Sequence, residues 1–114
     1  MRIFVVIPAY NESTTIESVI KEVKHYCPNI VVVDDGSTDN TFDLAQTAEV
    51  FALRHLVNRG QGAALQTGID FALAQGAEII VMFDADEQHD AQDIALLVGP
   101  IADGRTEVVL GSRF

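Results

Sequence analysis

Short apolar runs alternate along the chain with segments in which apolar residues recur at helical spacing. The apolar runs cover residues 3–7, 30–33, 50–53, 78–83 and 107–110. Most of these runs are nearly continuous rather than alternating, which is typical of strands that are buried on both faces. Strands and helices in strict alternation, joined by short turns, predict an α/β fold: a mostly parallel sheet with helices on both faces.

The segments between the runs predict four helices. Their expected buried residues are Ile16, Val19, Ile20 and Val23 in the first helix, Phe42, Ala45 and Ala48 in the second, Leu65, Ile69, Ala72 and Leu73 in the third, and Ile94, Leu97, Val98 and Ile101 in the fourth. Asn11 or Ser13 would cap the start of the first helix. Gly68 would let the third helix approach the sheet closely.

Four polar clusters directly follow four of the predicted strands. They are residues 8–12, 34–37, 84–86 and 111–113. In an open parallel sheet, ligands bind in the crevice outside the carboxyl ends of the strands. The ordinary polarity of turns accounts for Asp39, Asn40 and Asp43, but it explains poorly why so many other side chains would face one crevice. Those side chains are Pro8, Tyr10, Glu12, Asp35, Asp84, Asp86 and Arg113.

Asp84-Ala85-Asp86 is the strongest candidate for chemistry, because it places two carboxylates where a buried strand ends. Such a pair on its own is commonly a solvated turn. Beside the other clusters it favours a metal-bridged diphosphate, since hard divalent cations such as Mg²⁺ or Mn²⁺ prefer carboxylate oxygens and also bind phosphate and water. His89 is a weaker candidate ligand because imidazole is a softer partner, and a structural role is preferred for it.

Composition and charge narrow the class of protein. The chain has 114 residues, which fits one domain, and a net charge of −10 with seven Lys plus Arg. This charge argues against nucleic acid as a partner, because proteins normally neutralise nucleic-acid phosphates with clustered basic side chains. An acidic chain that handles phosphate groups needs a cation.

Cysteine use and hydropathy bear on location. Cys27 is the single cysteine, so no internal disulfide can form, and its place on an apolar stripe predicts a core residue. No run approaches the roughly 18 apolar residues of a membrane span. We therefore expect a cytoplasmic protein.

The spacing of the glycines and acidic residues excludes several nucleotide sites. The dinucleotide fingerprint needs Gly-x-Gly-x-x-Gly after the first strand, whereas Gly60-Gln61-Gly62 follows the third and has Leu65 in place of the last glycine. The Gly-x-x-x-x-Gly-Lys-Ser/Thr phosphate loop does not occur in the sequence. A phosphoacceptor receiver domain would have its acidic pair after the first strand and a lysine after the fifth. Here the pair follows the second strand, and the fifth leads to Arg113.

The polar clusters, together with the loop after the third strand, resemble in order the motifs of family 2 glycosyltransferases of the GT-A fold. The matching segments are Val6-Ile7-Pro8-Ala9-Tyr10-Asn11-Glu12, Val32-Val33-Asp34-Asp35-Gly36-Ser37-Thr38-Asp39, Asn58-Arg59-Gly60-Gln61-Gly62-Ala63-Ala64, Asp84-Ala85-Asp86-Glu87-Gln88-His89 and Gly111-Ser112-Arg113. Within the family, the chain is most similar to dolichyl- or polyprenyl-phosphate sugar synthases. The resemblance implies that residues 1–114 form the N-terminal, nucleotide-sugar-binding domain.

The resemblance also implies roles for individual residues. The residues expected to hold the nucleotide of a UDP- or GDP-linked sugar are Pro8, Tyr10, Glu12, Val33, Asp35, Asp84, Ala85 and Asp86. Asp84 and Asp86 would bind Mg²⁺ or Mn²⁺, and Asp86 and Arg113 would act in catalysis by stabilising the departing nucleoside diphosphate. Gln88 would support the metal or the sugar. Glu87 and Asp90 depart from the residues usual in the family and add negative charge beside the metal.

In the resembling family an acceptor-binding half follows the Gly-Ser-Arg motif, and this sequence ends at Phe114. The resemblance implies metal-dependent, inverting transfer to a polyprenyl phosphate, by an enzyme peripheral to the membrane in its complete form. We expect poor transfer by this chain alone, and self-association through apolar surface that the absent segment would cover. A non-catalytic nucleotide-binding or interaction module stays open as an alternative. A sugar-nucleotide-forming nucleotidyltransferase is less favoured, because its glycine-rich, arginine-containing loop after the first strand is absent.

Overall fold

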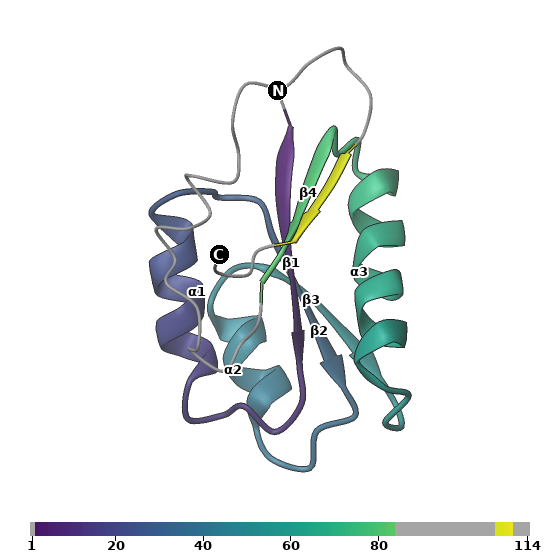
Figure 1. The fold of residues 1–114 in the computed structure, drawn as a ribbon. Coiled ribbons are helices and arrows are strands. Elements are labelled where there is room, and N and C mark those ends of the chain that lie inside the picture. The colour runs from purple at the N-terminus through teal and green to yellow at the C-terminus, as the bar shows by residue number, and fades with distance from the viewer. Residues whose placement is uncertain (1, 84–106, 111–114) are drawn as a thin grey trace.

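The structure, a computed structural model, describes residues 2–83 and the strand backbone of residues 107–110. Its strands are β1 (Ile3–Ala9), β2 (Ile30–Asp35), β3 (Phe51–His55), β4 (Ile79–Met82) and β5 (Glu107–Leu110). They form one sheet in the order β3-β2-β1-β4-β5, and every neighbouring pair is parallel (Figure 1). All the carboxyl ends therefore lie along one edge of the sheet. This confirms the expected α/β fold with a parallel sheet.

The described helices lie on both faces of the sheet. They are α1 (Ile16–Lys24), α2 (Thr41–Thr47) and α3 (Gln61–Ala74). Figure 1 shows α1 and α2 on one face and α3 on the other. The chain moves outward from β1 to β2 and β3 and then returns across β1 to β4, so crossovers of one hand must use opposite faces before and after this reversal.

Two hydrophobic clusters separate these helices from the sheet. On the α1 and α2 face, the buried members are Val5, Ile7, Ala9, Ile16, Val19, Ile20, Val23, Cys27, Ile30, Val32, Ala45, Ile79, Val81 and Phe83. On the α3 face they are Phe4, Val6, Val31, Val33, Ala64, Ala72, Ala77 and Ile80. Successive residues of β1 and β2 enter opposite clusters, as the twofold period of a strand requires. The prediction that Cys27 is a core residue is confirmed.

Three of the observed strands extend further toward the carboxyl edge than the apolar runs suggest, whereas β4 ends at Met82, one residue before the end of its run, and β5 ends where its run does. β1 continues to Ala9 and β2 continues through Asp35. The third strand was predicted at residues 50–53 but spans Phe51–His55, because its pairing with β2 continues to the end of that strand. Arg54 lies opposite Asp34 in this register, and His55 lies opposite Asp35. Two acidic residues expected in a turn are therefore the last residues of a buried strand.

Two helix predictions were wrong in detail. α1 begins after Thr15, whose side chain makes no capping bond, so neither Asn11 nor Ser13 is its N-cap. Leu73 is 45% exposed rather than buried, although Leu65 and Ile69 pack partly against the sheet as expected. The buried line of α3 consists of the small residues at positions 64, 68 and 72, which bring the helix so close to the sheet that the neighbouring row is only partly covered. The predicted fourth helix lies outside the described residues.

No helix in residues 2–83 combines the length and the apolar character that crossing a lipid bilayer requires.

Gly68 is the point of closest approach between α3 and the sheet. A Cβ atom at this position would lie 2.3 Å from Val6 Cγ1 and 3.1 Å from Val33 Cγ2. We expect Gly68→Ala to lower the free energy of unfolding by about 1–3 kcal/mol through overpacking. In Gly62→Ala, a matched control in the same helix, the new Cβ meets nothing within 4 Å, and up to about 1 kcal/mol should be gained from helix propensity. Urea unfolding measures both changes, and equal stability of Gly68→Ala and the wild type would contradict this close contact.

Candidate functional site

The described part of the predicted site lies at the carboxyl ends of β1 and β2. Pro8 and Val33 are cross-strand neighbours in the sheet, and both are buried. The Val33 side chain packs in the hydrophobic cluster between the sheet and α3, so it stabilises the end of β2 from within the core. Tyr10 is 45% exposed and Glu12 is partly buried in the loop after β1, while Asp35 ends β2. The sheet thus brings the predicted residues to one edge but gives only some of them access to solvent.

The remaining predicted residues are Asp84, Ala85, Asp86, Gln88 and Arg113, and they lie outside the described residues. The chain reaches residue 84 from the carboxyl end of β4, where the Phe83 N–H donates a hydrogen bond of 3.0 Å to the carbonyl of Val6. β1 and β4 flank the point where the strand order reverses. Open α/β sheets bind ligands at this point. Residues 2–83 alone contain no cluster of three or more His, Cys, Asp or Glu side chains that would hold a metal ion.

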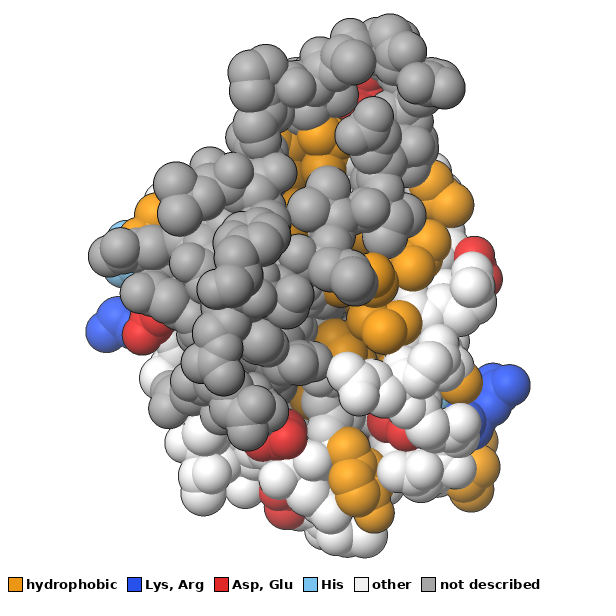
Figure 2. Space-filling view, viewed as in Figure 1, with side chains coloured by type: hydrophobic (Ala, Val, Ile, Leu, Met, Phe, Trp, Pro, Cys, Tyr) orange, Lys and Arg blue, Asp and Glu red, His pale blue; other side chains and the backbone are white. Residues whose placement is uncertain are grey.

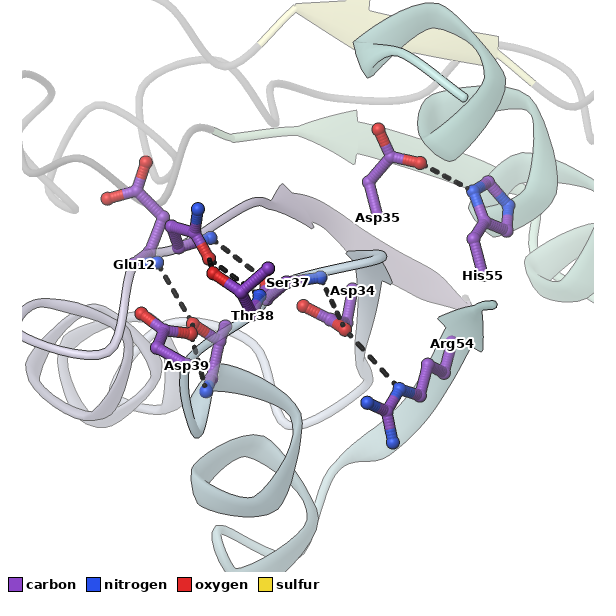
Figure 3. A network of polar contacts seen from close by, with 10 residues as sticks. Glu12, Asp34, Asp35, Ser37, Thr38, Asp39, Arg54 and His55 are labelled. Carbon is purple, nitrogen blue, oxygen red and sulfur yellow. Dashed lines mark hydrogen bonds and ion pairs between the residues drawn. The ribbon is translucent and has the colours of Figure 1, made fainter. Parts of the chain in front are cut away.

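Side chains from the loop after β2, and from Thr41 at the start of α2, hold the loop after β1. Three consecutive backbone N–H groups, at Asn11, Glu12 and Ser13, donate to Ser37 Oγ at 2.8 Å, Thr41 Oγ1 at 2.9 Å and Asp39 Oδ2 at 3.2 Å. In return, Asn11 Oδ1 accepts from the Thr38 N–H at 2.9 Å and the Thr38 hydroxyl at 3.2 Å. Figure 3 shows this network, with the Glu12 carboxylate pointing away from it. These contacts fix the loop that carries Tyr10 and Glu12 relative to β2.

Both loops contain backbone conformations that favour special residues. Asn11 has φ +53°, a left-handed conformation that asparagine tolerates better than most residues. Gly36 has φ +75°, and a Cβ there would lie 2.6 Å from Asn58 N and from Val57 C. A third loop, between β3 and α3, is therefore packed directly on the backbone of the second. Only glycine permits this approach at residue 36.

Asp35 joins the third loop to the sheet. Its Oδ1 accepts hydrogen bonds from His55 Nδ1–H at 2.7 Å and the Arg59 N–H at 2.9 Å, and its Oδ2 accepts one from the Gly60 N–H at 2.8 Å. Burial opposes ionisation, but the hydrogen bonds from Arg59, His55 and Gly60 outweigh it and lower the pKa of Asp35 below its ordinary value. The carboxylate therefore stays ionised although its side chain is only 4% exposed.

Asp34, the neighbouring carboxylate, has weaker partners. Its side chain is fully buried, and Oδ2 accepts from the Ser37 N–H at 3.3 Å and lies 3.8 Å from Arg54 Nε. Its Oδ1 has no hydrogen-bond partner among the described residues. The Arg54 guanidinium also stacks over the ring of Phe42 at 5.1 Å, which holds it beside Asp34.

The edge is electrostatically acidic. On the face seen in Figure 2, several acidic side chains lie over the lower part, near the ends of β1 and β2. Basic side chains of the described residues lie at the two flanks, where acidic side chains are also seen. Glu12, Asp34, Asp35 and Asp39 all belong to this edge. An anionic diphosphate that docks here would be repelled unless a cation accompanies it.

Two structural features of the candidate site were missed by the sequence predictions. His55 was not considered, because the third strand was expected to stop at Leu53; continuing that strand to the end of β2 would have placed His55 beside Asp35. Asn11 and Asp39 were assigned to a cap and to ordinary turn polarity. The clue was the density of short polar residues in both loops, since these side chains commonly bond to nearby backbone groups.

Asp35→Asn should lower the free energy of unfolding by about 1.5–3 kcal/mol at pH 7, because Asn loses the charge that strengthens three hydrogen bonds. The pKa of Asp35 is lower in the folded chain, so its contribution is present above the unfolded-chain value of about 3.9 and disappears as the pH falls through the folded-state value. The gap between wild type and variant should therefore narrow in acid. Urea unfolding across pH, with the exposed Asp43→Asn as control, measures it; a gap that is constant from pH 7 to pH 2 would contradict this assignment.

Asn11→Ala and Asn11→Gly separate the contribution of the Asn11 side-chain hydrogen bonds from that of its left-handed backbone conformation. Both variants lose the bonds from Thr38, but only alanine must adopt the left-handed conformation against its preference, at a cost of about 1–2 kcal/mol. We expect both to destabilise the fold, alanine by about 1 kcal/mol more than glycine, since glycine carries its own entropic cost. Thermal and urea unfolding give the comparison. Equal losses in the two variants would show that the backbone conformation contributes nothing.

Comparison with known proteins identifies the family. A family model described as glycosyl transferase family 2 matches residues 4–114. The UDP-N-acetylglucosamine–dolichyl-phosphate N-acetylglucosaminyltransferase of Methanococcus voltae is 40% identical, over 97% of this chain and 51% of that protein. The polyprenol monophosphomannose synthase of Mycolicibacterium smegmatis is 34% identical, over 99% of this chain and 45% of that protein. The chain thus spans about half the length of the curated relatives it matches.

Solved structures agree with the fold. Glucosyl-3-phosphoglycerate synthase from Mycobacterium tuberculosis, crystallised with Mn²⁺, UDP and glucosyl-3-phosphoglycerate, superposes with a TM-score of 0.71 at 32% sequence identity. The superposition covers 87% of this chain and 39% of that one. The fold and nearly the whole sequence therefore lead to the same assignment: this chain belongs to glycosyl transferase family 2.

Proposed function

We propose that residues 1–114 form the donor-nucleotide site of an inverting, metal-dependent glycosyltransferase that acts on a polyprenyl phosphate. The observation that carries this proposal is the junction of loops at the carboxyl ends of β1 and β2, beside the point where the strand order reverses. Its support from relatives is that two of them are named as enzymes acting with dolichyl phosphate or polyprenol.

The loop after β1 and the end of β2 would bind the nucleoside. Tyr10 offers an exposed aromatic ring for stacking on a base, and the Glu12 carboxylate points away from the network that fixes its backbone. Asp35 would accept a hydrogen bond from the base or the ribose. Pro8 and Val33 would form the rigid base of this site, since both are buried in paired strands. The nucleotide would thus meet a preorganised surface.

Asp84 and Asp86 would hold Mg²⁺ or Mn²⁺, with Ala85 beside the nucleotide. The described edge fits such an ion, because its carboxylates supply hard oxygen donors and a negative potential, and Asp34 Oδ1 has no hydrogen-bond partner among the described residues. When bound, the metal would neutralise charge on the departing diphosphate. Arg113 would add a fixed positive charge to a phosphate group, and Gln88 would orient the sugar or support the metal.

The acceptor would attack directly. A phosphate oxygen of the polyprenyl phosphate would form the new bond to the anomeric carbon as the bond from that carbon to the nucleoside diphosphate breaks. A single displacement of this kind inverts the anomeric configuration. The acceptor oxygen is already anionic, so no general base is required. Because the acceptor is a lipid phosphate, the reaction would take place at a membrane surface.

Calorimetric titration with UDP and GDP tests the metal assignment. We expect nucleotide affinity to depend on Mg²⁺ or Mn²⁺ and to fall when a chelator is added. Asp86→Asn should remove most of the metal-dependent part, on the order of a few kcal/mol, because a charge-assisted ligand is lost. Asp43→Asn makes the same change at an exposed residue of α2 and should bind as the wild type does.

Equal affinity of the wild type with and without divalent metal would remove Asp84 and Asp86 as ligands. Absence of binding to either nucleotide would overturn the proposed donor site as a whole.

A further inference from the structure

A chain of polar side chains, of which Asp35 and His55 are buried and Thr67 is partly buried, runs from β2 through β3 to α3. His55 Nδ1–H donates to Asp35 Oδ1 at 2.7 Å, and the Nε2 atom of the same ring lies 2.8 Å from Thr67 Oγ1. The side chains of His55 and Asp35 are 7% and 4% exposed. Figure 3 shows the His55 ring directed at the Asp35 carboxylate, away from the contacts between the first two loops. The proposed function assigns no role to His55 or Thr67.

The hydrogen bonds to Asp35 show how many acceptor positions of its carboxylate remain available. A carboxylate oxygen has about two lone-pair positions. Among the described residues, Oδ1 accepts two hydrogen bonds, from His55 and Arg59, whereas Oδ2 accepts one, from Gly60. One acceptor position therefore remains, on Oδ2. Little of the Asp35 side chain reaches solvent, so the direction of this acceptor position depends on how the carboxylate is oriented. A rotated carboxylate would no longer present Oδ2 to a ligand.

His55 is the only side chain among these partners of Asp35, since the other two bonds come from backbone N–H groups. An ionised carboxylate only accepts, so Nδ1 must carry the hydrogen. In the neutral ring Nε2 then accepts from the Thr67 hydroxyl. Contacts at both nitrogens, one from β2 and one from α3, prevent the ring from turning.

We propose that His55, held by Thr67, is a positioning residue that orients Asp35 so that Oδ2 accepts one N–H or O–H donor from the nucleotide. This inference rests on the proposed nucleotide site and adds the residue that sets its geometry. His55 acts through Asp35 and does not itself touch the nucleotide.

Two substitutions at His55 separate orientation from packing. In His55→Asn, the amide Nδ2 stands as many bonds from the backbone as Nδ1 does, so it keeps a donor for Asp35 while losing the ring. His55→Leu fills space but supplies no donor. We expect His55→Leu to weaken binding of UDP or GDP, whichever the wild type binds, by roughly tenfold to a hundredfold, the range for a hydrogen bond to a charged group. His55→Asn should recover most of this loss although it packs less well.

Four further measurements complete the test. His25→Leu removes an exposed histidine and should leave affinity unchanged. Nitrogen-15 chemical shifts of the His55 ring in the free protein should show hydrogen on Nδ1, and Thr67→Val should shift the Nε2 signal and weaken binding. Melting temperatures of all variants show whether each one folds.

The outcomes distinguish this inference from the proposed function. If the wild type binds no nucleotide, the proposed site fails and the role of His55 fails with it. If the wild type binds and folded His55→Leu binds equally well, or Asn fails to recover affinity, only the positioning role is overturned. Should His55→Leu not fold, the Thr67→Val affinity and the ring shifts decide, and hydrogen on Nε2 alone in the wild type would overturn the proposal.

Discussion

The structure depends on one constraint: β1 is hydrogen-bonded on both sides and covered on both faces, so its interior residues can only be apolar. Phe4, Val5, Val6 and Ile7 are buried almost completely, and they feed two separate hydrophobic clusters. Burial of apolar surface on this scale is the main driving force for folding. Polar groups have room only in the last residues of the strands and in the loops beyond them. The apolar centre of the sheet thus determines where the chemistry of the chain can lie.

The end of β2 shows how much structure is needed to keep charge near such a core. Asp34 and Asp35 are adjacent and both are buried, and an unpartnered buried carboxylate is costly. Asp35 is stabilised by two backbone N–H groups and a histidine, and these contacts require the left-handed turn at Gly60. Within the described part of the chain, Asp34 has only two long contacts. Neighbouring residues of one motif therefore have different energetic roles, one central to the third loop and one loosely satisfied.

Much of this architecture was predictable from sequence, because strand and helix periods are local signals. The apolar runs located the ends of the described strands to within two residues, and Gly68 marked the close approach of α3 correctly. Leu73 was misplaced because sequence spacing does not show how close a helix lies to a sheet. His55 and Asn11 were missed for a deeper reason: their roles depend on which residues of distant segments are opposite one another, and the register of β2 with β3 is a tertiary property. The metal and catalytic assignments at residues 84–88 and 113 stay predictions.

The pairing of Asp35 with His55 across β2 and β3 links the site to the alignment of the sheet. A slip of one residue between these strands would turn every side chain of β3 to the opposite face. His55 would then point away from Asp35, and Arg59 and Gly60 would lose their fixed distance from the carboxylate. Since β3 is an edge strand, held by a neighbour on one side only among the described strands, its alignment is the least secured of those at the site. A chain that has paired these strands in the wrong register would therefore keep much of its hydrophobic core but lose the hydrogen bonds at Asp35. These hydrogen bonds thus form only when the β2–β3 register is native.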